Sequence, residues 1–227
     1  MLRITDNGNS EYVIIIRKNH SASEKTAAEE LAAYLKKITD AEIPVKTDDE
    51  KKTDHEIVIG FTNRGGKGKK ELGEEGFTIK TEGKRLFILG SEVRGALYGV
   101  YSFLEKCCGC RFYTDTCERV PKVNMLTVPE IDCTELPGFE YRNVYWFAQG
   151  GEMISAKLKN NGGMGHELTE RVGGGINYIG SFCHTFPDLG ETGNVWDMPC
   201  LSDEAMYQTV LKNVRKRLIE NPLLKII

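Results

Sequence analysis

Short apolar runs alternate with amphipathic stretches along the first half of the chain. Residues 12–17 are mostly β-branched, which predicts a buried strand. Ser21 and Glu24 have the spacing of a capping box. Apolar residues then recur on one helical face, at Ala27, Leu31, Leu35 and Ile38. We therefore predict a helix that begins after Ser21 and ends near residue 39.

Further short apolar runs predict more strands, at residues 43–45, 56–60, 77–81 and 85–89. Pro44 favours a sheet edge for the first of them, because proline cannot donate a ladder hydrogen bond. The turn at Glu82 and Gly83 joins the last two into a predicted hairpin. Short extended pieces follow at residues 111–113 and 125–128.

A second amphipathic helix is predicted at residues 92–108, with Gly109 as its C-terminal cap. Its apolar stripe consists of Val93, Leu97, Val100 or Tyr101, and Leu104. Gly95 and Gly99 would let this helix lie close to a sheet. The order of elements predicts an α/β fold, an α+β domain in which two helices cover one face of a mixed sheet.

Prolines mark the stretch at residues 120–138, which we predict to be a linker leaving a first domain at residues 1–132. Beyond it the pattern changes. Strands are predicted at residues 141–147, 176–182 and 224–227, and a helix capped by Ser202 at residues 203–220. Alternating strands and helices are typical of a parallel barrel, which needs eight repeats and about 250 residues. Residues 137–227 are therefore predicted to be the first strands and helices of an incomplete (β/α)8 barrel, a truncated TIM-barrel-like segment.

Composition excludes several classes of function. The net charge of −3 offers no basic surface for nucleic acid. The longest strong apolar run, residues 12–16, is too short to cross a membrane. The first ten residues lack the apolar centre of a signal peptide, which leaves both a cytoplasmic location and export after cleavage open.

No cofactor or metal is predicted. Cys107, Cys108 and Cys110 do not have a zinc spacing, and no histidine lies near them. The glycine-rich loop at residues 60–68 departs from a phosphate-binding loop, because its lysine comes one residue late and Gly68 stands where Ser or Thr is needed.

Three segments carry a family resemblance: residues 94–105 (RGALYGVYSFLE), residues 109–113 (GCRFY), and Val120 with Pro121. Together they resemble the non-catalytic N-terminal domain of α-glucuronidases of glycoside hydrolase family 67, a layout shared with the second domain of family 20 β-hexosaminidases. Residues 137–142 (PGFEYR) resemble the start of the first barrel strand in the hexosaminidases. The whole chain is similar to the start of large bacterial proteins that join this domain to a glycosidase-like barrel and carry a His-Thr-Phe segment, here residues 184–186.

The resemblance implies a parent protein that hydrolyses a glycosidic bond in a polysaccharide, with acidic or amino sugars as the candidate units. Such hydrolysis needs two carboxyl groups, which in the related barrels arrive on later strands. Glu167, Glu170 and Glu191 are predicted to be surface charges, so we expect this chain to be inactive alone. The alternative is a non-catalytic carbohydrate-binding or assembly module, which could self-associate through the unpaired edges of an unfinished barrel.

Four residues are candidates for sugar binding. Arg142 matches the hexosaminidase arginine that holds hydroxyls of the terminal sugar, although a structural ion pair is the alternative. His184 follows a predicted barrel strand, where active sites collect, and Asp188 could orient it or bind a hydroxyl. Trp196 lies in a predicted loop and could stack on a sugar, whereas Trp146 is predicted to be core.

Overall fold

We analysed a computed structural model of the chain. It describes residues 1–65, 70–163, 167–176, 185–194, 196–197, 199–200 and 202–220. These residues form two compact units, residues 1–176 and residues 177–227, each of which is considered by itself. The predicted boundary near residues 132–137 lies earlier than this division, so residues 137–176 pack with the first unit. The assignment of residues 137–227 to a barrel stays a prediction.

A six-stranded mixed sheet forms the base of the first unit, with the strand order β10-β5-β6-β4-β2-β3. Its strands are β2 (Val13–Ile16), β3 (Val45–Thr47), β4 (Glu56–Ile59), β5 (Phe77–Glu82), β6 (Arg85–Gly90) and β10 (Asp132–Glu135). The four neighbouring strands β3, β2, β4 and β6 are parallel, whereas β5 pairs antiparallel with β6 on one side and with β10 on the other. The α/β fold class, the hairpin of β5 and β6, and the edge position of β3 are confirmed.

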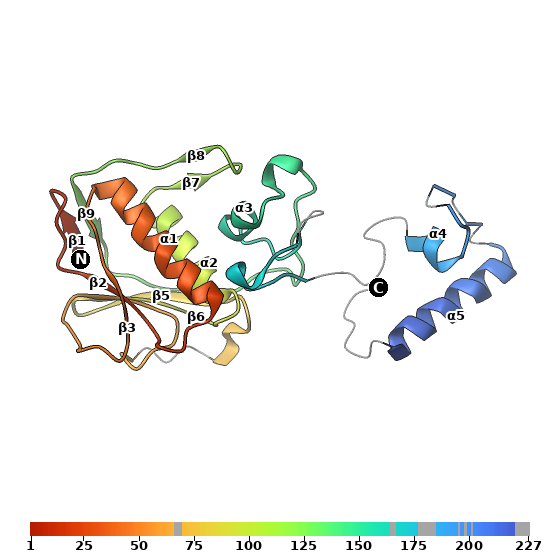
Figure 1. Ribbon diagram of the computed structural model, residues 1–227, viewed down its shortest axis with the longest axis horizontal. Helices are drawn as coiled ribbons and strands as arrows, with labels where there is room; N and C mark the ends of the chain where they lie inside the picture. Colours follow the sequence, from red (N-terminus) through yellow and green to blue (C-terminus); the bar gives the residue numbers. More distant parts are fainter. Residues whose placement is uncertain are drawn as a thin grey trace. The chain divides into compact units, whose positions relative to one another are not determined.

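Two helices, α1 (Ala22–Thr39) and α2 (Gly95–Lys106), lie side by side on one face of this sheet, as predicted (Figure 1). The capping box of α1 is present: the Ser21 hydroxyl accepts from the Glu24 amide, and the Glu24 carboxylate accepts from the Ser21 amide. Gly109 has a φ of 74°, the left-handed conformation expected after the end of α2.

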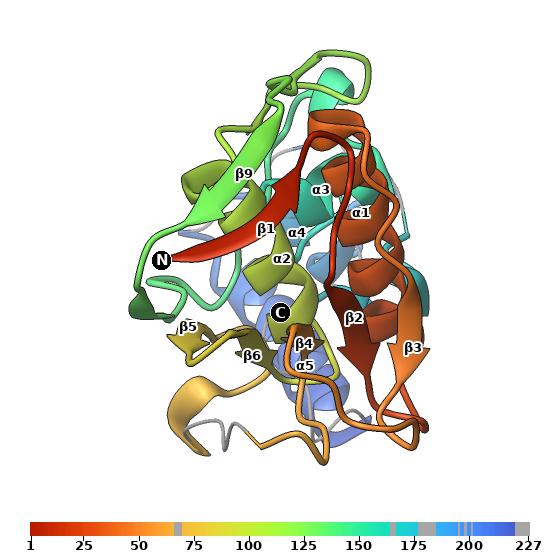
Figure 2. The same ribbon diagram turned by 90° about the vertical axis from the view of Figure 1, so that its left-hand side faces the viewer.

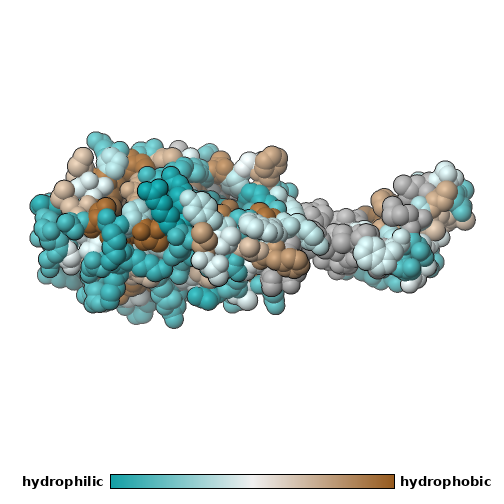
Figure 3. Space-filling view, turned by 90° about the horizontal axis from the view of Figure 1, so that it is seen from above, coloured by the Kyte–Doolittle hydropathy of each residue, from teal (hydrophilic) through white to brown (hydrophobic). Residues whose placement is uncertain are grey.

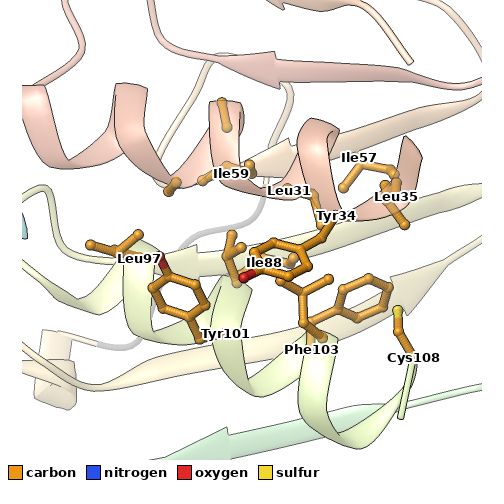
Figure 4. Close-up of a cluster of buried hydrophobic side chains, with 14 of the residues drawn as sticks. Leu31, Tyr34, Leu35, Ile57, Ile59, Ile88, Leu97, Tyr101, Phe103 and Cys108 are labelled. Carbon is orange, nitrogen blue, oxygen red and sulfur yellow. The ribbon is translucent and has the colours of Figure 1, made fainter. Parts of the chain in front are cut away.

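The main core fills the space between the helices and the sheet (Figure 4). Leu31 and Leu35 of α1 meet Ile57 and Ile59 of the sheet, and Tyr101 comes from α2. The strands bury both faces, because Val13, Ile15, Val58, Phe87 and Leu89 form a second cluster. Burial on both faces explains why these strands are continuous apolar runs and not alternating ones.

Glycine allows α2 to approach the sheet closely, as the sequence predicted. A Cβ atom at Gly95 would lie 2.5 Å from the carbonyl oxygen of Gly76, and one at Gly99 would lie 2.7 Å from Cγ2 of Ile88. Both distances are too short for a real side chain.

Two small ribbons complete the first domain. The strands β1 (Leu2–Asp6) and β9 (Met125–Val128) pair at one end of the helix layer (Figure 2), and β7 (Arg111–Phe112) pairs with β8 (Glu118–Arg119). The predicted linker at residues 120–138 is wrong in this respect, since β9 and β10 both lie within it. Strand β9 pairs with β1, and strand β10 pairs with β5 at the edge of the six-stranded sheet.

Residues 137–176 contain short helices: η2 (Phe147–Gln149), α3 (Glu152–Lys157) and η3 (Glu170–Val172). The strand predicted at residues 141–147 is wrong. The backbone carbonyl of Arg142 accepts hydrogen bonds from the amides of Asn161 and Gly162, so a loop and not a strand pairs with it. Trp146 is 53% exposed, which corrects its placement in the core.

The second unit contains α4 (Thr185–Leu189) and α5 (Glu204–Glu220), which confirms the last predicted helix. Its cap is Asp203 and not Ser202, because the Asp203 carboxylate accepts from the Ala205 amide at 2.9 Å. No residue of α5 is buried, and Leu218 is 43% exposed. The strand predicted at residues 176–182 lies outside the described residues except for Ile176, and the one predicted at residues 224–227 lies wholly outside them.

Hydrophilic residues cover most of the face of the first unit seen in Figure 3, where hydrophobic residues form small separate patches. No helix within the described part of the chain is both long and apolar enough to cross a membrane.

Candidate functional site

A buried ionic cluster joins the sheet domain to the segment that carries Arg142. Glu75, which precedes β5, lies between two arginines. Nε of Arg94 is 2.8 Å from Oε1 of Glu75, and Nη2 of Arg142 is 2.6 Å from Oε2. Glu75 and Arg94 are 8% and 5% exposed, so the charges compensate one another away from water. We call Glu75, Arg94, Arg142 and Asn161 the junction cluster.

Asn161 completes the junction cluster and is fully buried. Its amide nitrogen donates to Oε1 of Glu75 at 2.8 Å and to the carbonyl of Glu140 at 2.7 Å. Its amide oxygen accepts from the backbone amide of Arg142 at 2.8 Å. One side chain therefore satisfies three polar groups, two of which are the backbone carbonyl and amide on either side of Tyr141.

Every side-chain nitrogen of Arg142 donates to the protein. Besides Nη2 with Glu75, Nε donates to the carbonyl of Lys159 at 2.8 Å and Nη1 to that of Phe139 at 2.6 Å. The side chain is 19% exposed. This geometry is that of the structural ion pair that the sequence left as the alternative. A sugar hydroxyl would have to replace one of these acceptors, so the sugar-binding role of Arg142 stays a proposal.

Arg94 holds the far end of the same segment. It is the N-cap of α2, and its Nη1 donates to the carbonyl of Gly173 at 2.9 Å, while Nη2 pairs with Glu74. Burial raises the pKa of Tyr98 well above its usual range. The Tyr98 hydroxyl therefore stays protonated and donates to the carbonyl of Asn160 at 2.8 Å. These contacts dock Asn160 and Gly173 on the first turn of α2.

Sequence reasoning missed Glu75, Arg94 and Asn161 as site residues. Arg94 opens the segment that carries the family resemblance, but the pattern of that segment predicts no separate role for it. Glu75 and Asn161 lie in irregular segments without a periodic pattern, so the sequence offers no signal that they meet Arg142.

The other candidates belong to the second unit. Asp188, on α4, forms an ion pair with Arg217 of α5. Trp196 lies in a turn and is 75% exposed, as a stacking residue needs to be. His184 lies outside the described residues. Arg142 belongs to the first unit, so its spatial relation to Asp188 and Trp196 is not determined.

No group of three or more histidine, cysteine or acidic side chains among the described residues could hold a metal ion. Burial raises the pKa of Cys107, Cys108 and Cys110, the last to about 11. Their thiols therefore stay protonated near neutral pH, which makes them poor nucleophiles and poor metal ligands.

The first domain is a mixed sheet under two helices, with a buried ionic junction to the next segment. Residues 4–103 match the family model described as "Glycosyl hydrolase family 67 N-terminus". The predicted resemblance to this N-terminal domain is therefore confirmed over these residues. No curated protein matches the chain.

The chain is similar to a number of solved structures, of which two are described. One is a family GH115 4-O-methyl-α-glucuronidase with specificity for decorated arabinogalactans, with 13% identity and a TM-score of 0.54 over 100% of this chain and 36% of that one. The other is the GH20 β-N-acetylhexosaminidase of Streptomyces coelicolor A3(2), with 16% identity and a TM-score of 0.44 over 62% of this chain and 24% of that one. The chain thus spans well under half the length of either protein. The first likeness supports the fold.

Proposed function

We propose that this chain is the N-terminal part of a carbohydrate-active, glycoside hydrolase-like protein. Its reaction would be hydrolysis of a glycosidic bond in a polysaccharide, of the α-glucuronidase or hexosaminidase kind. The observation that carries this proposal is the family 67 N-terminal domain at residues 4–103, folded as a sheet under two helices.

Within this proposal the first domain is an accessory part that positions the next one. Glu75 holds Arg142 through a buried ion pair, and Arg94 holds Gly173 through its backbone carbonyl. In the proposal, residues 137–227 open the glycosidase-like barrel, and Arg142, His184, Asp188 and Trp196 contact the sugar. The reacting carboxyl groups are supplied from outside this chain, so it has no turnover alone.

Aryl glycoside hydrolysis by the purified chain tests the last point. We expect no release of nitrophenol from aryl α-glucuronides or aryl β-N-acetylglucosaminides above a heat-denatured control. Turnover that disappears in Glu167→Gln, Glu170→Gln or Glu191→Gln, while the variants keep the fold by circular dichroism, would show that the chain carries its own catalytic carboxylate.

The reading frame of the source gene beyond the codon for Ile227 tests the parent function. Continued strand and helix repeats with carboxylates after the strands would support the hydrolase. A stop codon at that point would favour the non-catalytic module.

The alternative function is a carbohydrate-binding or assembly module, and the exposure of Trp196 is the observation that favours it. It predicts sugar binding without turnover, weakened by Trp196→Ala or Asp188→Asn in calorimetric titration. The assembly form predicts a mass that rises with protein concentration in sedimentation, whereas a monomer at high concentration would contradict it.

A further inference from the structure

A site for an ammonium group lies where the helix layer meets the β7–β8 ribbon. The rings of Tyr34 on α1 and Phe112 on β7 form two of its walls, with centroids 5.5 Å apart and an interplanar angle of 76°. Glu118 of β8 forms a third wall, and its carboxylate accepts a hydrogen bond from the Tyr34 hydroxyl. Aromatic rings and a carboxylate both attract a cation, so we call these three side chains the cation socket.

Lys157, the last residue of α3, occupies the cation socket. Its Nζ is 5.3 Å from the ring centroid of Tyr34 and 5.2 Å from that of Phe112. The same atom is 3.2 Å from Oε2 of Glu118. The Lys157 side chain is 16% exposed, so water screens these attractions less than it screens those of a surface ion pair.

The helical state of α3 depends on its docking contacts. The helix is six residues long, far below the length at which a helix is stable by itself. Ile154 and Ala156 are its buried apolar residues, and both belong to the main core. Beyond the helix, Lys159 pairs with Glu105 of α2 at 2.7 Å, but these side chains are 26% and 25% exposed, so their attraction is weaker than that inside the socket.

We propose that Lys157 acts as a latch for α3. With its ammonium in the cation socket, α3 stays docked on the first domain. When that charge is removed, α3 opens as a local unit, while the sheet, α1, α2 and the junction cluster stay folded. Asn161 of the junction cluster lies four residues beyond Lys157, so the latch and the cluster fix the same segment at two separate points. The latch is a property of the first unit and does not depend on the proposed function.

Lys37 shares the cation socket without linking it to α3. Its Nζ is 4.5 Å from the ring centroid of Tyr34 and 3.0 Å from Oε1 of Glu118. Lys37 and Tyr34 belong to the same helix, so this ammonium fixes only the position of Glu118 relative to α1. Replacing Lys37 removes a like charge from the socket and leaves the contacts of Lys157 in place. Lys37 therefore provides a matched control on the same carboxylate and the same ring.

Hydrogen exchange of the full chain, followed by mass spectrometry, tests the latch. Four amides, at residues 155 and 158–160, report on α3, because their acceptor carbonyls lie within residues 151–156. Lys157→Met keeps the apolar stem of the side chain and loses the charge. In this variant the four amides should exchange about tenfold faster than in wild type, whereas the amides of β2, β4 and β6 should keep their wild-type rates.

Lys157→Arg keeps the charge, so its α3 amides should exchange close to the wild-type rate, and those of Lys37→Met should do the same. Unchanged exchange in Lys157→Met would overturn the latch and assign the docking of α3 to Ile154 and Ala156. The latch would equally fail if Lys157→Arg or Lys37→Met exchanged as fast as Lys157→Met, since the charge of Lys157 would then not be the cause. Faster exchange of the strands together with α3 would show that α3 does not open separately, and would likewise contradict the proposal.

Discussion

At the residue scale, one buried carboxylate decides how the two parts of the first unit are joined. Glu75 is the only negative charge in the junction cluster, and it compensates two guanidinium groups. Such a cluster adds little to stability compared with a well-packed apolar one, but removing one partner leaves buried charges without compensation. The main contribution of Glu75 is therefore to fix the positions of the Arg94 and Arg142 side chains, and its contribution to the free energy of folding is secondary.

We predict that Glu75→Gln lowers the free energy of unfolding by about 3–5 kcal/mol, because Arg142 then loses its carboxylate partner and Arg94 keeps only its ion pair with the exposed Glu74. Urea denaturation followed by circular dichroism measures the change. Glu71→Gln is the control, since Glu71 is exposed in the turn just before Glu75. A loss no larger than that of the control would mean that water already compensates the two arginines.

At the scale of elements, the packing of α2 on the sheet requires a residue without a Cβ atom at position 95. Gly95 lies against the backbone of Gly76 and of Gly90, whose own Cβ position is occupied by the backbone of Gly95. The backbones approach more closely than any residue with a Cβ would allow. The glycine pattern of the family resemblance thus has a steric reason in this fold.

We predict that Gly95→Ala destabilises the chain by about 1–3 kcal/mol, because the helix must move away from the sheet. The helix propensity of alanine works in the opposite direction, so the sign of the change is informative. Gly138→Ala is the control, since a Cβ there meets no atom within 4 Å. Thermal unfolding of the two variants provides the comparison, and a Gly95→Ala variant as stable as wild type would contradict this packing.

At the scale of the whole molecule, stability is concentrated in the first unit. Both apolar clusters of the described residues lie between Leu2 and Val172. In the second unit α5 has no buried residue, and Leu189 is the one buried large aliphatic side chain among its described residues. A unit of this size with so little core is marginal by itself.

We therefore predict that a chain ending at Ile176 unfolds cooperatively, with a Tm within about 3 °C of the full chain. Differential scanning calorimetry of the two chains measures this. A broad transition, or a much lower Tm, would show that the second unit contributes to the core.

Local patterns determined much of the first domain. β-branched runs, the capping box and the glycine turn are decided within a few residues, so the strands, α1, α2 and the β5–β6 hairpin could be predicted. Strand β10 could not, because Asp132–Glu135 has little apolar character and becomes a strand only beside the open edge of β5. The segment at residues 141–147 has the residue types of a strand. It is not one, because the carbonyl of Arg142 accepts hydrogen bonds from the loop amides of Asn161 and Gly162.

The sequence by itself thus determined the class of the first domain, because packing motifs such as the glycines of α2 lie within one short segment and can be recognised from their spacing. Only the tertiary structure decided what Arg142 contacts, since Glu75 and Asn161 lie 67 and 19 residues away in the sequence. It likewise decided that Trp146 is exposed, because burial depends on what lies opposite a ring, and spacing along one segment carries no information about that.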